Sequence, residues 1–152
     1  MPVSSEDGTA YNRRWTMANV TYPLYREALL NGDANIGIIT GDLKAALVDT
    51  DVYTYSAADK FLTDLSGVVG TSVSLATKVV AGGNFDSANP TWSSVSGPEV
   101  EAVVHYIDTG IPGDSRLVAY IDDGVGGMPV TPNGGDITFD VDPAGWWRLG
   151  TT

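Results

Sequence analysis

The chain has 152 residues, and its 19 acidic and 8 basic side chains give a formal net charge of −11 at neutral pH. It contains no cysteine, which excludes disulfides, thiolate metal ligands and a cysteine nucleophile. Residues 1–30 hold three bases and three acids, so residues 31–152, with five bases and sixteen acids, carry the whole net charge. A body this acidic repels phosphate backbones, so we expect no nucleic-acid partner.

The sequence also predicts a protein without a membrane partner. No apolar run approaches the roughly 18–20 residues that a membrane span requires. The first 15 residues lack the apolar stretch of a secretory signal, so we expect a protein that starts in the cytosol.

Residues 1–16 contain few aliphatic side chains, and we predict that they form an irregular N-terminal arm. Within the arm, Tyr11, Arg13, Arg14 and Trp15 belong to residue types that are enriched at protein interfaces. They are the candidate partner-binding residues. The alternative is a terminal segment without a function. We expect residues 17–152 to form a single β-rich domain.

Two short helices are predicted in the first half of the chain. In residues 21–31, Pro23 suits the first helical turn and Gly32 suits the end of the helix. In residues 56–65, Ser56 is a candidate N-cap before a stripe of apolar residues on one helical face.

The strongest strand signal is a hairpin made of residues 99–107 and 116–121, joined by the Gly- and Pro-containing turn 109–115. Small apolar and aromatic side chains alternate with a mixed set along its first strand, while its second strand is almost wholly apolar. Residues 85–90 are predicted to be an irregular connector. Further strands are predicted at residues 42–49, 69–75, 77–80, 90–95, 136–141 and 146–149.

Strands at this spacing, separated by turns rich in glycine and proline, predict a mainly β protein. The expected architecture is a β-sandwich or jelly-roll-like sheet pair with two short helices and the irregular N-terminal arm.

Catalytic motifs are missing from the sequence. His105 is the only histidine, and it lies in the middle of a predicted strand, where a structural role is expected. No Gly-x-Ser-x-Gly nucleophile elbow accompanies it. A single histidine also excludes a histidine-rich zinc site. We therefore expect a protein that is not an enzyme.

Acidic pairs are common, as expected in so acidic a chain. Asp122 with Asp123, and Asp140 with Asp142, have part of the character of a calcium loop, but neither matches an EF-hand. Glu99 and Glu101 share one strand face, as a glycosidase pair can. Such pairs are usually solvated, so we expect no metal and no cofactor.

Three tryptophans in predicted strands leave two interpretations open. Trp92, Trp146 and Trp147 could form a platform on which a sugar ring stacks, or they could fill the core or an interface. The second interpretation is the more common one for such residues.

Several stretches together resemble a group of small structural proteins of tailed bacteriophages. The resemblance covers roughly residues 17–149, so the arm lies outside it. The stretches are LKAALVDT (residues 43–50) followed by Tyr53, FLTDL (61–65), FDSANPTW (85–92), VEAVVHYIDT (100–109), SRLVAYID (115–122) and PVTPNGGDI (129–137).

The resemblance implies a non-enzymatic component of a virion. The expected role is that of a decoration or cement protein on the capsid surface, bound to the major capsid protein and forming a homo-oligomer on the lattice. One alternative is a structural component of the tail or of the head–tail connector. A further alternative, from another class, is a carbohydrate-binding β-sandwich module or small glycosidase that uses the tryptophans and acids.

Overall fold

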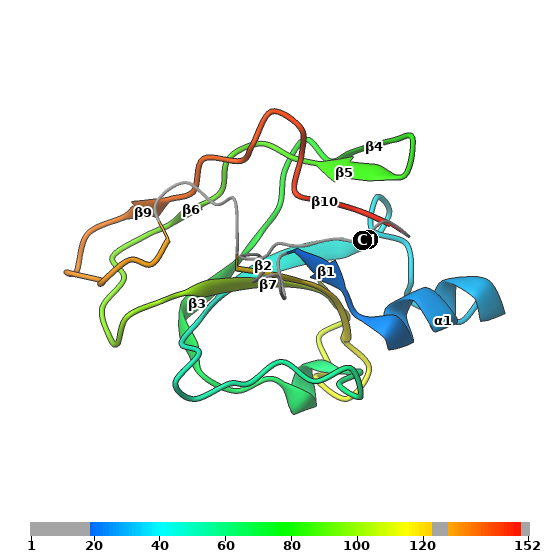
Figure 1. Ribbon diagram of the computed structural model, residues 1–152, viewed down its shortest axis with the longest axis horizontal. Helices are drawn as coiled ribbons and strands as arrows, with labels where there is room; N and C mark the ends of the chain where they lie inside the picture. Colours follow the sequence, from blue (N-terminus) through cyan, green and yellow to red (C-terminus); the bar gives the residue numbers. More distant parts are fainter. Residues whose placement is uncertain (1–18, 123–127, 150–152) are drawn as a thin grey trace, which may run out of the picture.

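The computed structural model describes residues 19–122 and 128–149, and it is mainly β (Figure 1). The candidate docking residues Tyr11, Arg13, Arg14 and Trp15 lie outside the described residues. The elements in chain order are β1 (Val20–Thr21), α1 (Pro23–Asn31), β2 (Asp42–Val48), the 3₁₀ helix η2 (Leu62–Asp64), β3 (Val68–Ser74), β4 (Val79–Ala81), β5 (Asn84–Asp86), β6 (Thr91–Trp92), β7 (Ala102–Asp108), β8 (Arg116–Ile121), β9 (Ile137–Thr138) and β10 (Trp147–Arg148).

The main sheet has five antiparallel strands in the order β1-β8-β7-β2-β3. The predicted hairpin is confirmed as β7 and β8, and the pairing places His105 opposite Ala119. Strand β2 then pairs with the other edge of β7 along its whole length, from Asp42 opposite Asp108 to Val48 opposite Ala102. Strands β8, β7 and β2, whose residues are mostly buried, thus occupy the three inner positions of the sheet.

Two smaller antiparallel sheets, β10-β5-β4 and β6-β9, lie over one face of the main sheet (Figure 1). Trp92 of β6 donates its indole N–H to the carbonyl of Ala45 in β2 over 3.1 Å. Phe85 of β5 meets the ring of His105 edge-on, with 5.9 Å between centroids. The small sheets therefore cover the face of β7 on which His105 lies, and they supply the apolar surface that this face needs.

The segment between β2 and β3 lies over the opposite face of the main sheet (Figure 1). Its Tyr53 and Tyr55 pack against Tyr120 of β8, with ring centroids 6.3 and 5.4 Å apart. The Tyr53 hydroxyl is 2.7 Å from that of Tyr22 and donates to Asp59 over 2.6 Å. These bonds satisfy the buried phenol groups, which would otherwise destabilise the packed face.

Helix α1 is where the first helical pattern predicts it. Pro23 occupies the first turn, where no N–H donor is needed. Gly32 ends the helix in the left-handed conformation, with φ 69°, and its N–H bonds back to the last turn.

The predicted second helix, at residues 56–65, is wrong. The segment contains only the single turn η2, because its backbone pairs with the edge of β8 instead. Leu62 N–H donates to the carbonyl of Ser115, and Leu117 N–H donates to that of Lys60, over 2.7 and 3.0 Å. A single turn such as η2 is too short to be stable by itself. Hydrogen bonds to β8 satisfy backbone groups that would otherwise be bonded within a helix.

The strand predictions differ in their outcome. Residues 42–49 and 69–75 correspond to β2 and β3, and the shorter β4, β6, β9 and β10 lie at or within two residues of the other predicted strands. The connector predicted at residues 85–90 is wrong at its start, because Asn84–Asp86 forms β5. This strand pairs with β4 on one side and β10 on the other, a contact that spans about sixty residues of sequence.

Candidate functional site

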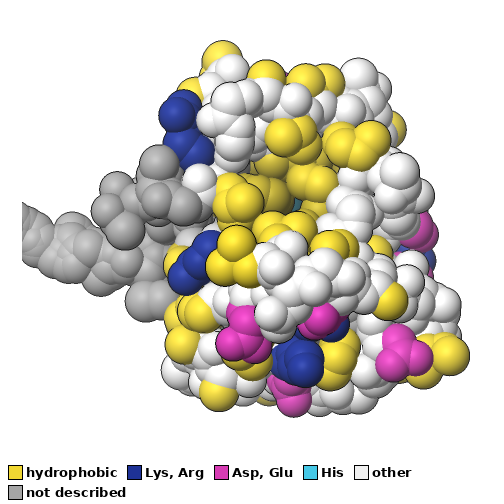
Figure 2. Space-filling view, turned by 90° about the vertical axis from the view of Figure 1, so that its right-hand side faces the viewer, with side chains coloured by type: hydrophobic (Ala, Val, Ile, Leu, Met, Phe, Trp, Pro, Cys, Tyr) yellow, Lys and Arg dark blue, Asp and Glu magenta, His cyan; other side chains and the backbone are white. Residues whose placement is uncertain are grey.

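An apolar groove opens beside helix α1, on the side of the molecule that Figure 2 shows. Its volume is about 340 Å³. Its walls come from α1, from residues 36–40 and from the sheet β10-β5-β4, and none of the described side chains that line it is charged. The lining residues are Tyr25, Leu29, Ile36, Gly37, Ile38, Ile39, Thr40, Val80, Gly83, Phe85, Trp147 and Leu149.

The floor of the groove is built by Phe85 and Trp147, which are cross-strand neighbours. Val80 pairs with Phe85 on the other side, so its side chain projects from the same face of the small sheet and lies at the rim. The rings of Phe85 and Trp147 stack with centroids 5.1 Å apart. The opposite wall is held in place by Tyr25, whose hydroxyl donates to the carbonyl of Ile36 over 2.8 Å. The walls of the groove are therefore fixed by packing and by a hydrogen bond.

Exposure rises from the floor of the groove to its rim. Phe85 is completely buried and Trp147 is 6% exposed, whereas Ile39 is 49%, Val80 48% and Leu149 38% exposed. Figure 2 shows hydrophobic side chains gathered around this hollow, with charged groups outside it. Burial raises the pKa of Tyr25 to about 12, so this phenol also stays neutral. A concave, uncharged surface with exposed aliphatic side chains is suited to bind another apolar group.

A row of aromatic rings connects the groove with a second pocket. From the groove, the row runs from Phe85 and Trp147 through His105 to Trp146 and Phe139. His105 lies in the middle, 4.5 Å from the Trp146 ring, and accepts a hydrogen bond at Nδ1 from the Trp147 indole over 3.1 Å. The row thus joins the small sheets to the centre of the main sheet.

His105 lies in a strand, as predicted, and the structure places it in the core. It is completely buried, and this burial lowers its pKa from 6.5 to about 3. Because Nδ1 accepts the Trp147 bond, the neutral ring carries its proton on Nε2. The rings of Phe85, Trp146 and Trp147 contact this imidazole.

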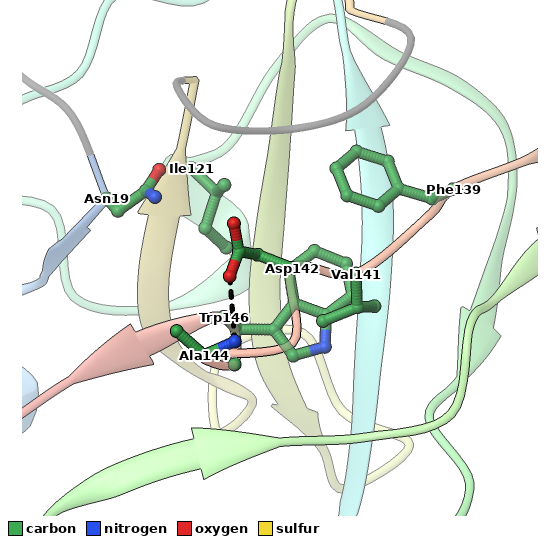
Figure 3. A pocket seen from close by; sticks show the side chains of 8 residues that line it. Asn19, Ile121, Phe139, Val141, Asp142, Ala144 and Trp146 are labelled. Atoms are coloured by element: carbon green, nitrogen blue, oxygen red, sulfur yellow. Dashed lines mark hydrogen bonds between the residues drawn. The ribbon is translucent and has the colours of Figure 1, made fainter.

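The second pocket, of about 230 Å³, lies at the Phe139 end of the aromatic row (Figure 3). Asn19, just before β1, and Asp142 are among the residues that line it. Asp142 Oδ1 accepts a hydrogen bond from the Ala144 N–H over 2.7 Å, which fixes the turn before β10. The one carboxylate of this pocket is thus used in closing a turn of the backbone.

The acidic pairs do not gather into a larger cluster. Within residues 19–122 and 128–149, no three His, Asp or Glu side chains are close enough together to hold a metal ion. Glu101 accepts bonds from the backbone N–H and the hydroxyl of Thr50, and Asp140 accepts one from Asn89. Asp123 lies outside the described residues, so its pairing with Asp122 stays a prediction.

The three tryptophans fill the core and do not form an exposed platform. Trp92, Trp146 and Trp147 are only 1%, 3% and 6% exposed. Each indole N–H has a partner inside the protein: Trp92 donates to Ala45, Trp146 to Ser87 and Trp147 to His105. The interpretation of these rings as a sugar-stacking surface is wrong, because their faces are covered by other side chains.

The groove itself is not predicted by the sequence. Its residues come from segments that are distant in the sequence, namely helix α1, residues 36–40, strands β4, β5 and β10, and the residues Gly83 and Leu149 beside them. The available signal is the run Ile36, Ile38 and Ile39, which is too apolar for an ordinary surface loop and belongs to no predicted helix or strand.

The chain matches no protein-family model, and no curated protein is significantly similar to it. None of the helices among the described residues is long and apolar enough to span a membrane.

Proposed function

We propose that this protein is a structural component of a tailed-bacteriophage virion, a non-enzymatic decoration or cement protein that binds the major capsid protein on the outer shell and stabilises it. The observation that carries the proposal is the sequence resemblance, which extends over roughly residues 17–149. In architectural terms, we propose that the main sheet and the smaller sheets over it form a sandwich of the jelly-roll-like kind. The N-terminal arm, through Tyr11, Arg13, Arg14 and Trp15, is the proposed contact with the capsid.

The geometry of the body supports this proposal. A cement protein needs a rigid unit that does not deform under load, and here two layers cover the main sheet, one on each face. It also needs adhesive surfaces, and the uncharged groove is one such surface on an otherwise acidic body. On a symmetric lattice, many weak contacts of this kind add up to strong attachment.

The direct test is cryo-electron microscopy of virions of the phage that encodes this chain. We expect density for the protein on the outer shell, in hundreds of copies and at symmetry-related positions. Density in a dozen or fewer copies at the tail or neck would contradict the capsid assignment and support the tail or connector alternative. Absence of the chain from purified virions would contradict both.

A binding experiment tests the proposed arm contact. Capsids stripped of this protein are incubated with the full chain or with a variant lacking residues 1–16, and the bound fraction is measured after sedimentation. We expect the truncated variant to bind more weakly. Equal occupancy by both proteins would show that the arm does not contribute to attachment.

A further inference from the structure

We propose that the apolar groove and the free edge of strand β4 beside it form one binding site for an extended peptide segment of a partner protein. The segment adds to β4 as a further strand and places one aliphatic side chain in the groove. The expected sequence pattern of the segment is basic–aliphatic–basic. This inference goes beyond the proposed function, because it names the chemistry of the bound segment and does not depend on the capsid assignment.

The outer edge of β4 offers an unused backbone donor and acceptor. Strand β4 is the last strand of the sheet β10-β5-β4, and its three residues are all exposed (Figure 1). Its middle residue, Val80, lies opposite Phe85, whose carbonyl accepts the N–H of Trp146 on the β10 side over 2.8 Å. Because a strand residue directs its N–H and C=O to the same side, Val80 and Phe85 form a pair without mutual hydrogen bonds, and the two groups of Val80 point away from β5. Within residues 19–122 and 128–149, no backbone hydrogen bond is formed to Val80 on that side.

The groove supplies the place for the side chain of an added residue. Val80, Phe85 and Trp147 project from the face of the small sheet that lines the groove. Directly opposite residues of neighbouring strands have their side chains on the same face. A residue bonded to Val80 therefore directs its side chain to the groove side, next to Val80 itself, which is half exposed. An aliphatic side chain gains most there, because none of the described lining side chains is charged.

The opposite face of the small sheet and the charge of the body favour basic flanking residues. The residues on either side of the bound aliphatic one point away from the groove, since successive strand residues alternate between faces. On that face Asp86 of β5 lies opposite Val79 of β4, so a long basic side chain on the added strand can extend across Val79 toward this carboxylate. The chain as a whole has a net charge of −11, which attracts the same basic residues.

The groove and the edge together select an extended segment over other occupants. A small apolar molecule can fill the groove, but it leaves the backbone groups of Val80 unused. A helix bonds its own backbone groups internally, so it cannot pair with a strand edge. An extended segment satisfies both features, as in other cases of strand addition to a sheet edge. The edge of the main sheet is less suitable, because a register shift between Ala45 and Leu47 interrupts the pairing of β3 with β2, and such irregularities protect edges.

The probe is the blocked peptide acetyl-Thr-Lys-Ile-Lys-Thr-amide, titrated to millimolar concentration into the ¹⁵N-labelled full chain and followed by NMR. We expect shifts of the Val80 amide and of the Trp147 indole N–H. Two matched peptides keep both positive charges. Serine in place of isoleucine removes the apolar side chain and should weaken binding about tenfold or more. N-methylation of the isoleucine removes its N–H donor and should weaken binding about fivefold.

Variants of the protein test the same two features from the other side. Val80→Pro removes the outward N–H but keeps the bonds of β4 to β5, because proline is tolerated where an N–H faces away from the sheet. Val80→Ala is its matched control, and proline should weaken binding of the isoleucine peptide about fivefold more than alanine does. Ile39→Glu places a charge at the rim and should weaken binding about tenfold or more. Ile111→Glu should bind like the full chain, because Ile111 is exposed to a similar extent, 59%, and does not line the groove.

The outcomes separate strand addition from simpler binding. Absence of shifts at Val80 and Trp147 at millimolar peptide would overturn the proposal. Equal affinity for the isoleucine and N-methylated peptides would also overturn it, since the groove would then accept a side chain without pairing at the edge. Circular dichroism checks that each variant is folded, and the peptide comparison is made on the unaltered chain, so it does not depend on any variant. Failure of the capsid assignment in the microscopy would leave these results unchanged.

Discussion

The buried histidine gives this protein a pH dependence of stability that can be calculated and then removed by substitution. His105 is completely buried among Phe85, Trp146 and Trp147, and none of these three neighbours is ionisable. Its pKa is about 3 in the folded protein and 6.5 without the effect of burial. Between these values the unfolded chain binds a proton that the folded chain does not bind. The free energy of unfolding therefore falls as the pH is lowered.

The lowered pKa sets the size of the effect. The full difference between 6.5 and about 3 corresponds to about 5 kcal/mol of stability, present at pH 7 and lost by the time the pH reaches the folded pKa. Of this, about 2 kcal/mol is lost between pH 7 and pH 5. Solvent does not screen this effect, because the His105 side chain is completely buried.

The assay is urea unfolding of the full chain and of His105→Gln at pH 7 and pH 5, followed by tryptophan fluorescence. Glutamine does not titrate, and its side-chain oxygen can accept the bond from Trp147. The substitution lowers stability at both pH values, but the gap between the two proteins should narrow by about 2 kcal/mol at pH 5, because only the parent loses the histidine contribution. Carboxylates titrate in both proteins and cancel in the comparison. A gap that does not change with pH would refute the reasoning, as would a His105 that titrates near 6.5 in the folded protein by NMR.

Two further substitutions test the packing on the opposite face of the main sheet and the turn that leads into it. Tyr22→Phe removes a hydroxyl that is 2.7 Å from that of Tyr53, and it should lower the free energy of unfolding by about 1 kcal/mol in urea titrations; no change would show that the bond contributes nothing. Gly67→Ala places a Cβ 2.7 Å from the carbonyl oxygen of Asp49 at φ +66°, whereas at Gly82, with φ +59°, no atom lies within 4 Å of the added Cβ. Alanine is strained in the left-handed conformation at both positions. Gly67→Ala should lower the free energy of unfolding by at least about 1 kcal/mol more than Gly82→Ala does, because the backbone near Gly67 must also shift. Equal melting temperatures for these two variants would contradict the close approach of Gly67 to the turn at Asp49.

Local chemistry explains why part of the fold is readable from the sequence. The hairpin β7–β8 is specified by two apolar runs and the turn between them, and α1 by Pro23 at its start and Gly32 at its end. Each of these signals acts within a few residues, so no knowledge of distant segments is required. The mainly β class follows from the same kind of pattern.

Distant contacts explain the parts that the sequence misses. Residues 56–65 have a helical pattern, but the edge of β8 offers hydrogen bonds to their backbone, and the pairing of Phe61 with Arg116 replaces the helix. Strand β5 contains only three residues, and Trp147, about sixty residues later, is one of its partners. A strand this short is stable only within a sheet, so its own sequence carries little signal.

The same division applies to the candidate site. The sequence by itself determined an acidic body, an arm of distinct composition and a set of apolar segments that had to be buried, because these follow from residue types alone. Only the tertiary structure decided that Trp147 and Phe85 form the floor of the groove, with Ile39 and Val80 half exposed at its rim. It also decided that His105 lies in the core beneath this floor. The physical reason is that a groove is the space left between elements, and the packing of elements distant in the sequence determines its shape.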